Sequence, residues 1–314
     1  MSKRQEIKVD KNIAILIPAL NEEKTILKVI NDFRAVLPEA RIYVFDNNST
    51  DNTYDVAKSA GAIVKKEVTK GKGNVIRRMF ADVEADVYVL VDGDDTYDAS
   101  IAPDLIRRLI ENDLDMVNTM RVTNGEGAYR RGHKFGNLLF SSIVRMIFGR
   151  LINDLLSGYR VFSRQFVKSF TAYSRRFEIE TELTVHCLEM RLPMDEVEAK
   201  YLARPEGSES KLSTWKDGVK ILATILKLLL GERPVISFLI IAACLALTCG
   251  IFGWFQVVRP WIRHGEVIRL PSAILATGLM ILSFLSLTSG IIIHHISQLR
   301  REIKRFTYLA AKRE

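Results

Sequence analysis

The sequence predicts an α/β protein with a mostly parallel sheet, followed by interfacial and transmembrane helices. Three observations support this. In the N-terminal part of the chain, short β-rich runs alternate with helical patterns, and polar clusters follow the apolar runs. Near the C-terminus, two long stretches contain no charged residue. The alternation is typical of β-α-β units, in which helices cover a largely parallel sheet.

The predicted elements follow one another closely along the chain. We expect a strand, a helix, a strand, a helix, a helix and a strand, in that order, at Ile13–Ile17, Glu22–Leu37, Ile42–Phe45, Asn52–Ala60, Gly71–Val83 and Val87–Val91. In sheets of this kind, ligands bind beyond the carboxyl ends of the strands. Three polar clusters fall at such ends, which favours one shared site: Pro18–Glu22, Asp46–Asp51 and Asp92–Asp98.

The acidic cluster Asp92–Asp98 (DGDDTYD) directly follows the apolar run Val87–Val91. A strand that ends in Asp-Gly-Asp brings two carboxylates to the edge of a sheet, where they repel each other unless a cation lies between them. A divalent metal held by one or two carboxylates usually also binds substrate phosphates. The motif therefore suggests activation of a diphosphate leaving group. A solvated acidic turn is the alternative.

The other two clusters each have two interpretations. Asn21 or Glu22 could cap the helix that follows the first strand, because their side chains can accept hydrogen bonds from free backbone N–H groups. Alternatively, they contact a nucleotide ribose or base. The segment Asp46-Asn-Asn-Ser-Thr-Asp offers the same choice.

The segment Lys70-Gly-Lys-Gly-Asn resembles a phosphate-binding loop, but it lacks the Ser or Thr that follows Gly-Lys in a P-loop. Gly71 and Gly73 would allow a ligand to approach the backbone closely, with Lys72 nearby as a positive charge. A helix-opening turn without a ligand is equally compatible with this pattern.

Charge and cysteine content narrow the class of protein. The 314 residues include 45 Lys and Arg against 37 Asp and Glu, a net charge of +8. A basic chain suits nucleic acid, anionic lipid or a phosphorylated substrate, but no nucleic-acid motif is present, so we expect no nucleic-acid partner. The cysteines Cys187, Cys244 and Cys249 show no metal-binding spacing and no disulfide framework. The polar start lacks the apolar core of a signal peptide, which predicts a cytosolic location for residues 1–230.

Val235–Val258 and Leu270–Leu299 contain no charged residue, and each is long enough to cross a bilayer as a helix. Basic residues gather before the first stretch and after the second, whereas the loop Arg259–Arg269 has few, so both termini should be cytosolic. We therefore expect a catalytic domain at 1–212, an amphipathic juxtamembrane helix at 213–233, a transmembrane hairpin at 234–299 and a basic cytosolic tail at 300–314. A pair of buried soluble helices is the alternative to the hairpin.

The motifs occur in a recognisable order: Pro-Ala-x-Asn-Glu, Asp-Asn-Asn-Ser-Thr-Asp, Asp-Gly-Asp and Asp154-Leu-Leu-Ser-Gly-Tyr-Arg160. This order resembles family 2 glycosyltransferases with the A-type, Rossmann-like fold. With two C-terminal spans, the chain is most similar to polyprenyl-phosphate glycosyltransferases, the group of bacterial GtrB-like glucosyltransferases and dolichyl-phosphate mannose synthases. The resemblance covers roughly residues 10–300.

The resemblance implies a nucleotide pocket lined by Pro18, Ala19, Asn21, Glu22 and Asp46. It places Asp92 beside the nucleotide and Asp94 on a Mg²⁺ or Mn²⁺ ion that bridges the diphosphate. The mannose synthases commonly have Gln where this chain has Thr96, and Asp95 is an additional carboxylate, so the second metal ligand stays open. We assign Asp92 and Asp94 to the metal, and Asn48, Lys72 and Gly93 to the nucleotide-sugar site.

On the acceptor side, Asp154 and Arg160 match the family motif, and with Asp94 they are the predicted catalytic residues. Asp154 is the family's candidate base, or it orients the acceptor or holds a cationic partner. We assign four residues to the lipid phosphate: Arg130, Arg204, Ser210 and Lys211. Solvated surface at Arg130 and a polar linker around Lys211 are the alternatives.

Glu178 and Glu180, in a segment after the acceptor motif, would line the sugar pocket or form the exposed face of a helix. Two amphipathic stretches, Leu138–Ile152 and Ser213–Gly231, could lie against lipid. For Leu138–Ile152, a buried core helix is equally compatible with the pattern.

The predicted activity is inverting transfer of a hexose from a nucleotide sugar, with UDP-glucose as the expected donor, to polyprenyl phosphate at the cytosolic membrane face. The second product is the nucleoside diphosphate. The alternatives are a GDP-mannose-dependent mannose synthase, a processive polysaccharide synthase and a catalytically silent membrane scaffold. We expect an integral protein of the inner or plasma membrane, with the bilayer, the nucleotide sugar and the lipid phosphate as partners. The sequence leaves homo-oligomerisation through the hairpin open.

Overall fold

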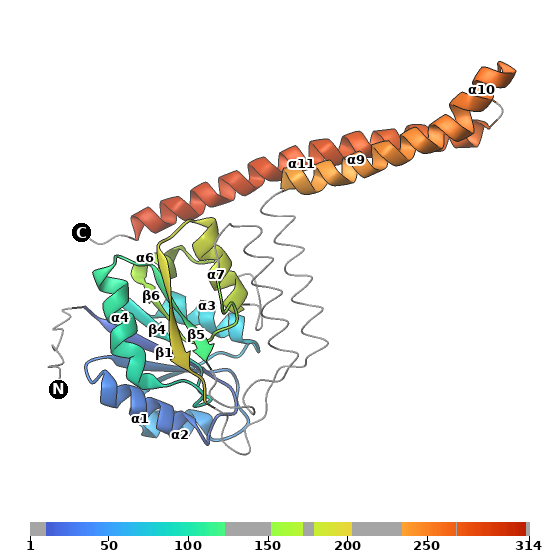
Figure 1. Cartoon of the computed structure of the whole chain (residues 1–314). Helices are drawn as coiled ribbons and strands as arrows, with labels where there is room; N and C mark the ends of the chain where they lie inside the picture. The colour runs from blue at the N-terminus through green and yellow to red at the C-terminus, as the bar shows by residue number, and fades with distance from the viewer. Residues whose placement is uncertain (1–10, 123–151, 172–178, 203–233, 268, 312–314) are drawn as a thin grey trace. The chain divides into compact units, whose positions relative to one another are not determined.

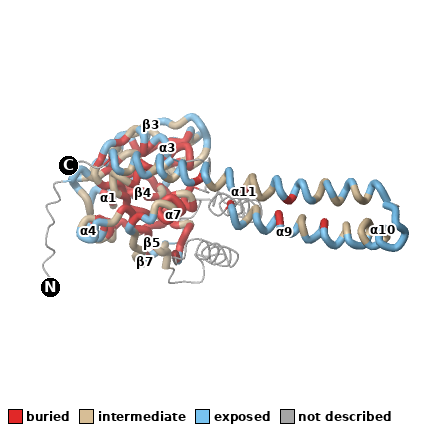
Figure 2. Tube along the Cα trace, turned by 90° about the horizontal axis from the view of Figure 1, so that it is seen from above, coloured by how far each residue is buried: buried red, intermediate tan, exposed pale blue. Residues whose placement is uncertain are grey.

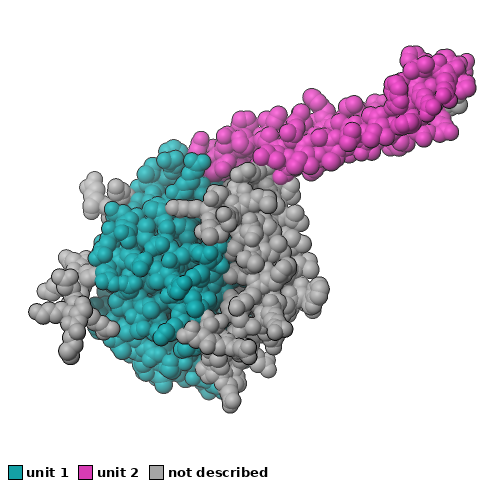
Figure 3. All heavy atoms as spheres, viewed as in Figure 1, with its two compact units in different colours: residues 1–221, 304–314 teal, residues 222–303 magenta. Residues whose placement is uncertain are grey.

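The computed structural model describes residues 11–122, 152–171, 179–202, 234–267 and 269–311 (Figure 1). The chain divides into two compact units (Figure 3). One comprises Met1–Ile221 together with Lys304–Glu314, and the other comprises Leu222–Ile303. We describe each unit separately and call the first the catalytic unit.

The catalytic unit contains a seven-stranded sheet with strand order β3-β2-β1-β4-β6-β5-β7. The strands are β1 (Ile13–Ala19), β2 (Arg41–Asp46), β3 (Ile63–Lys66), β4 (Val87–Leu90), β5 (Met116–Val122), β6 (Arg160–Ser163) and β7 (Met194–Lys200). Among the described strands, β6 alone runs antiparallel to its neighbours, β4 and β5; the other pairs are parallel. This confirms the predicted mostly parallel α/β fold.

Helices cover both faces of the sheet (Figure 1). The helical elements are α1 (Ile26–Val36), α2 (Thr53–Ser59), α3 (Lys72–Asp82), the 3₁₀ turn η1 (Ala99–Ile101), α4 (Ala102–Glu111), α6 (Arg164–Ser169) and α7 (Ile179–Glu189). Buried residues of α1, α2 and α4 form one apolar cluster with the sheet, and those of α3, α6 and α7 form a second.

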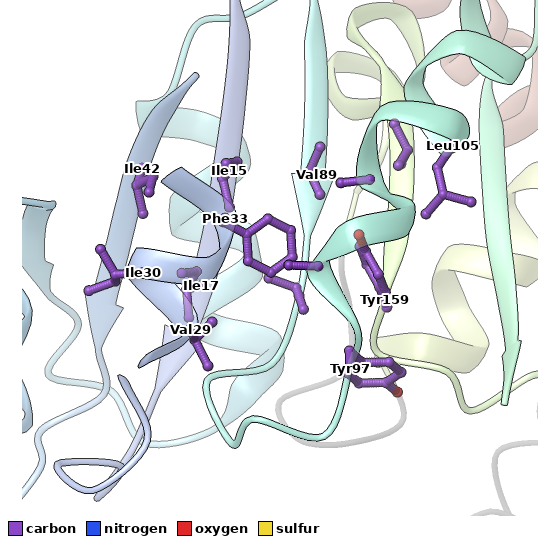
Figure 4. Close-up of a cluster of buried hydrophobic side chains, with 14 of the residues drawn as sticks. Ile15, Ile17, Val29, Ile30, Phe33, Ile42, Val89, Tyr97, Leu105 and Tyr159 are labelled. Carbon is purple, nitrogen blue, oxygen red and sulfur yellow. The ribbon is translucent and has the colours of Figure 1, made fainter. Parts of the chain in front are cut away.

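The alternation of side chains along β1 explains the two clusters. Ile15 and Ile17 point into the first cluster, which Figure 4 shows, while Ala14 and Leu16 belong to the second. Successive side chains of a strand point to opposite faces, so a strand covered by helices on both sides must be apolar throughout. The core therefore fixes β1 and β4 in the centre of the sheet, where their carboxyl ends can support a site.

The second unit contains the two candidate membrane-spanning helices, Pro234–His264 and Leu270–Ala310. The first consists of α9 (Pro234–Gly253), a π-helical turn (Trp254–Val258) and α10 (Arg259–His264), and the second is α11 (Leu270–Ala310). Only 11% of the most apolar window of each helix is buried within the protein (Figure 2), unlike the core helices of a soluble protein.

Small residues bring the two long helices close together. Ser283 Oγ donates a hydrogen bond of 2.8 Å to the carbonyl oxygen of Ala242. A Cβ atom at Gly290 would lie only 2.7 Å from Cβ of Phe238. Close approach at small residues is typical of helix pairs in membranes.

Two segments are helical where the sequence analysis predicted no helix. Arg259–His264, expected within a polar loop, is helical and ends at Gly265, whose φ of 78° is left-handed. The helix α11 also continues beyond Leu299 to Ala310, so most of the expected basic tail is helical.

Candidate active site

The three polar clusters predicted to share a site do lie together at the carboxyl ends of β1, β2 and β4. The backbone N–H of Asn47 donates to the carbonyl oxygen of Ala19 at 2.8 Å. The backbone N–H of Asn21 donates to Ser49 Oγ at 2.9 Å. Thr25 Oγ1 donates to the carbonyl oxygen of Gly93 at 2.7 Å, which joins the first cluster to the acidic one.

Each cluster turns through one residue with a left-handed backbone. The φ angles are 54° at Asn21, 61° at Asn48 and 57° at Asp95. Asn and Asp adopt this conformation more readily than other non-glycine residues. The turns therefore explain part of the polar sequence at these strand ends.

The structure does not support helix capping by Asn21. The helix α1 begins only at Ile26, with no side-chain hydrogen bond at its N-cap. Instead, Asn21 Oδ1 accepts a hydrogen bond from the backbone N–H of Thr50 at 2.8 Å. Asn21 therefore ties the first strand-end cluster to the second, and the capping interpretation is wrong for this residue. Glu22 is only partly buried, and its backbone N–H donates to Thr53 Oγ1 at 2.8 Å.

In the second cluster, Asp46 is buried, and both of its carboxylate oxygens accept from the backbone N–H of Ser49 at 3.3 Å. Asn47, which the sequence analysis did not select, is also buried. Its Oδ1 accepts from the backbone N–H of Gly71 at 2.7 Å, whereas the predicted Asn48 is exposed. Asn47 thus holds the glycine loop at the site. Nothing in the sequence alone distinguishes the two adjacent asparagines.

Lys72 lies between two carboxylates. Its Nζ atom is 2.5 Å from Asp92 Oδ1 and 2.5 Å from Glu180 Oε1. Burial alone would lower the pKa of Lys72, but the two carboxylates outweigh this effect, so the pKa is raised. The side chain therefore stays positively charged at neutral pH. Lys72 thus pairs with one carboxylate of the acidic strand end, Asp92, and with Glu180.

Glu180, at the start of α7, completes the charged group. Its side chain is only 6% exposed, so the exposed-face interpretation is wrong for this residue. Burial raises the pKa of Glu180, and the nearby Lys72 ammonium opposes this shift. The second carboxylate oxygen, Oε2, is buried without a hydrogen-bond partner among the described residues. A buried acceptor in this position is suited to a donor group of a ligand. Glu178 lies outside the described residues.

Within the acidic cluster, Asp94 and Asp95 have different surroundings. Asp94 is 4% exposed, and its Oδ1 accepts from Thr96 Oγ1 at 2.6 Å. Asp95 turns to α1, where its Oδ1 lies 2.6 Å from Lys28 Nζ. This leaves Asp92 and Asp94 as the carboxylates at the strand end.

These two carboxylates fit a Mg²⁺ or Mn²⁺ ion of the kind that takes its other ligands from phosphates and water. The described residues contain no group of three or more potential metal-ligating side chains. Such an ion would take its remaining ligands from phosphate oxygens and water.

In the acceptor motif, Asp154 is 2% exposed and forms a two-pronged ion pair with Arg121 of β5. Arg121 Nε lies 2.7 Å from Oδ2, and Arg121 Nη2 lies 2.9 Å from Oδ1. The backbone N–H of Leu156 also donates to Oδ1, at 3.1 Å. Asp154 therefore holds a cationic partner.

Arg160 is completely buried. Its guanidinium donates to the carbonyl oxygens of Ser157 at 3.0 Å and Leu155 at 2.8 Å, and to Thr184 Oγ1 at 2.8 Å. Burial lowers the pKa of Arg160. These contacts hold the turn formed by residues 154–160, which we call the acceptor turn, against α7.

Gly158 connects the acceptor turn to the acidic cluster. Its backbone N–H donates to Tyr97 Oη at 2.9 Å. A Cβ atom at this position would lie 2.2 Å from Asp92 Oδ2, which is too close for any side chain. The glycine therefore leaves the space that the Asp92 carboxylate occupies.

The remaining predicted residues are divided between the described and undescribed parts of the chain. Pro18, Ala19 and Gly93 lie at the ends of β1 and β4, as expected. The four residues assigned to the lipid phosphate lie outside the described residues: Arg130, Arg204, Ser210 and Lys211. The same holds for Ser213–Gly231 and for nearly all of Leu138–Ile152.

The fold and the acidic strand end define an A-type glycosyltransferase domain. Residues 14–170 match the family model described as glycosyl transferase family 2, and the chain belongs to this family. It is 30% identical over 293 residues to "Glycosyltransferase AglJ" of Haloferax volcanii, a match that covers 92% of this chain and 96% of the relative.

Two further proteins are similar over a large part of this chain. A "Dolichyl-phosphate hexose transferase" of Haloferax volcanii is 26% identical over 222 residues, covering 71% of this chain and 96% of that protein. The crystal structure of Mycobacterium tuberculosis glucosyl-3-phosphoglycerate synthase in complex with Mn²⁺ and UDP-glucose matches with a TM-score of 0.57 and 23% identity. That match covers 70% of this chain and 79% of the synthase, and it shows the shared fold.

Proposed function

We propose that this glycosyltransferase transfers one hexose from a nucleotide sugar, UDP-glucose, to polyprenyl phosphate at the cytosolic face of a membrane. The observation that carries the proposal is the coexistence, in one chain, of the Asp92–Lys72–Glu180 group at the sheet edge and two candidate membrane-spanning helices. The dolichyl-phosphate hexose transferase supports a lipid phosphate acceptor. The synthase bound to UDP-glucose supports the choice of donor.

The site carries groups suited to a diphosphate leaving group. Asp92 and Asp94 would hold a Mg²⁺ or Mn²⁺ ion, which supplies positive charge to the departing nucleoside diphosphate. Lys72 adds a second positive charge, because its ammonium stays protonated beside Asp92 and Glu180. Glu180 Oε2 is an acceptor for a hydroxyl of the donor sugar. These residues thus supply contacts for both the diphosphate and the sugar of a nucleotide sugar.

The acceptor side needs no strong base. A phosphate monoester has a second pKa of about 6 and is mostly dianionic at neutral pH, so its oxygen can attack the anomeric carbon directly. The bond from this carbon to the diphosphate oxygen breaks, and the configuration inverts. Asp154, whose two oxygens both contact Arg121, positions that cation at the acceptor turn.

The donor and acceptor are tested together. The purified full chain in nanodiscs is incubated with Mg²⁺, polyprenyl phosphate and either labelled UDP-glucose or labelled GDP-mannose. We expect an anionic labelled lipid with UDP-glucose only. A lipid formed only from GDP-mannose would identify GDP-mannose as the donor. A long polymer would identify a processive synthase, and the lack of a product with either donor would favour a silent scaffold.

A further inference from the structure

Within the catalytic unit, one face of the end of α11 contacts other elements. Lys304 Nζ lies 2.6 Å from Glu189 Oε2 of α7, and Tyr308 Oη donates to Asp115 Oδ2 at 2.8 Å. Arg164 Nη1 donates to the carbonyl oxygen of Ala311 at 2.6 Å. The Tyr308 ring packs against the second apolar cluster. Lys304 and Tyr308 are four residues apart and therefore lie on the same face of the helix.

The opposite face of this helix end is apolar and exposed. Ile303 is 58% exposed, Phe306 70% and Leu309 57%. Their spacing of three residues places them in a stripe, which continues the exposed Leu299 one turn earlier. A contiguous exposed apolar stripe on a surface helix indicates an interaction surface.

The charges around this stripe suit an anionic surface. Arg300 and Arg305 lie beside the stripe and Glu302 lies within it, four residues before Phe306, so the exposed side of this helix end has a net positive charge. Lys304 is on the opposite face and pairs with Glu189. Basic residues that flank an apolar helical face are typical of helices that bind anionic lipid at the bilayer interface.

The same helix also contains a candidate membrane span, so the stripe is continuous with a lipid-facing surface. The uncharged stretch Leu270–Leu299 has 30 residues, which corresponds to about 45 Å of helix. This exceeds the roughly 30 Å thickness of the hydrocarbon layer. A stretch of excess length is commonly accommodated by tilting, and a tilt toward the stripe brings Ile303, Phe306 and Leu309 down to the interface.

We propose that the apolar face of α11 from Ile303 to Leu309 binds the interface of an anionic bilayer, while its other face holds the catalytic unit. This inference rests on the membrane hairpin of the proposed function. The partner is the bilayer itself, recognised by apolar insertion and by phosphate contacts of the flanking arginines.

The test uses the full chain with its three cysteines replaced by alanine. Single cysteines are introduced at three exposed positions, Phe306→Cys, Leu282→Cys in the candidate span and Glu111→Cys at the end of α4. Each variant is labelled with an environment-sensitive fluorophore and placed in nanodiscs, one chain per disc. The discs carry nitroxide lipids, with the spin label either near the head group or deep in the acyl chains.

We expect shallow nitroxides to quench the label at position 306 several-fold more than the label at position 111, and deep nitroxides to quench the label at position 282. Arg300→Gln combined with Arg305→Gln should remove most of the difference in quenching between anionic and neutral discs. Neither arginine takes part in the contacts between the end of α11 and the rest of the catalytic unit.

The outcomes separate the two proposals. A label at 306 that stays unquenched while the label at 282 is quenched overturns the interface inference and leaves the hairpin intact. Labels unquenched at both positions overturn the hairpin as well. If the label at 306 reports an apolar environment only in discs that hold two chains, a second copy of the chain covers the stripe. This result also overturns the inference.

Discussion

Lys72 is the single residue that most affects the charge of the site. It neutralises two acids, Asp92 and Glu180, whose carboxylates would otherwise repel each other at the sheet edge. Its side chain is only 11% exposed, so water screens these interactions weakly. The charges of Asp92 and Glu180 are therefore largely compensated by Lys72.

Replacing Lys72 by Met should destabilise the protein by about 3–5 kcal/mol, because removal of one partner leaves buried charge uncompensated. Adding Glu180→Gln should recover part of this loss, since one of the two charges is then removed. Thermal unfolding in detergent measures both effects. Lys28→Met is the control, because its ion pairs with Asp32 and Asp95 are exposed and should contribute less than about 1 kcal/mol. Equal losses for the two lysines would contradict this account.

Three aspartates in or near the site should differ in their effect on catalysis. Asp94→Asn should lower kcat about 100-fold or more, a loss typical of removing a group that stabilises the leaving charge. Asp95→Asn should stay within a few-fold of the parent, because Asp95 pairs with Lys28. Asp154→Asn should retain more activity than Asp94→Asn, since the acceptor phosphate needs no base. Initial rates of lipid-product formation measure all three, and near-equal losses at Asp94 and Asp154 would refute the order.

At the scale of elements, Gly158 in the acceptor turn limits where the carboxylate of Asp92 can lie. Gly158→Ala should displace the Asp92 carboxylate, because the new Cβ would occupy its place. A misplacement of about 1 Å at a reacting centre can cost about 100-fold in rate, so we expect kcat to fall by that order. Gly278→Ala in α11, which has open space around it, is the control. Unchanged activity in Gly158→Ala would show that Asp92 needs no fixed position.

The packing of α7 on α6 should make stability depend on pH. His186 is buried between the rings of Phe166 and Phe170, with Nε2 3.1 Å from Ser169 Oγ. Burial, with a contribution from the nearby Lys304, lowers its pKa to about 3. The unfolded chain binds a proton near pH 6.5 and the folded chain does not, so stability falls as pH falls from about 6.5 toward 3.

At pH 5 the loss from His186 should be about 2 kcal/mol relative to neutral pH. Unfolding temperatures of the parent and of His186→Gln, measured between pH 7 and pH 5, isolate this contribution. The variant should lose less stability on acidification. Parallel pH profiles for the two proteins would show that His186 does not carry this dependence.

Sequence patterns predicted the first part of the fold better than the second. Between Ile13 and Val91, every strand and helix except the edge strand β3 was expected, because their apolar residues follow the periodicity of each element. The observed bounds are close to the expected ones, except that α1 begins at Ile26 and not at Glu22. The strands β5, β6 and β7 were not predicted. Buried polar residues interrupt their apolar pattern, such as Asn118 and Thr119 in β5 and Arg160 in β6. The edge strand β3 has no fully buried residue, so it gives a weak signal.

The candidate site was also predicted only in part. Strand-end position alone predicted that Asp46, Asn21 and Asp92 would come together, because parallel strands end at one edge of the sheet. The Lys72–Glu180 pair could not be predicted as a contact, since 108 residues separate its partners in the sequence. The roles of Asn47 and Gly158 likewise depend on contacts with distant segments.

At the scale of the whole molecule, the catalytic unit includes the last residues of the chain. Tyr308→Phe should destabilise the protein by about 1–3 kcal/mol, because Asp115 Oδ2 would lose its donor in a buried position. The Tyr54→Phe variant on α2 controls for the loss of a hydroxyl group. Thermal unfolding in detergent measures the difference. Equal effects for the two tyrosines would contradict an energetic role for this contact.

The proposed function requires transfer of one sugar to a phosphorylated isoprenoid. The most direct measurement is the mass and anomeric configuration of the lipid formed from UDP-glucose and polyprenyl phosphate by the parent chain in nanodiscs. We predict polyprenyl phosphate carrying a single glucose with inverted configuration, and none with Asp94→Asn. An unchanged lipid, a lipid with several sugars or a retained configuration would contradict the account.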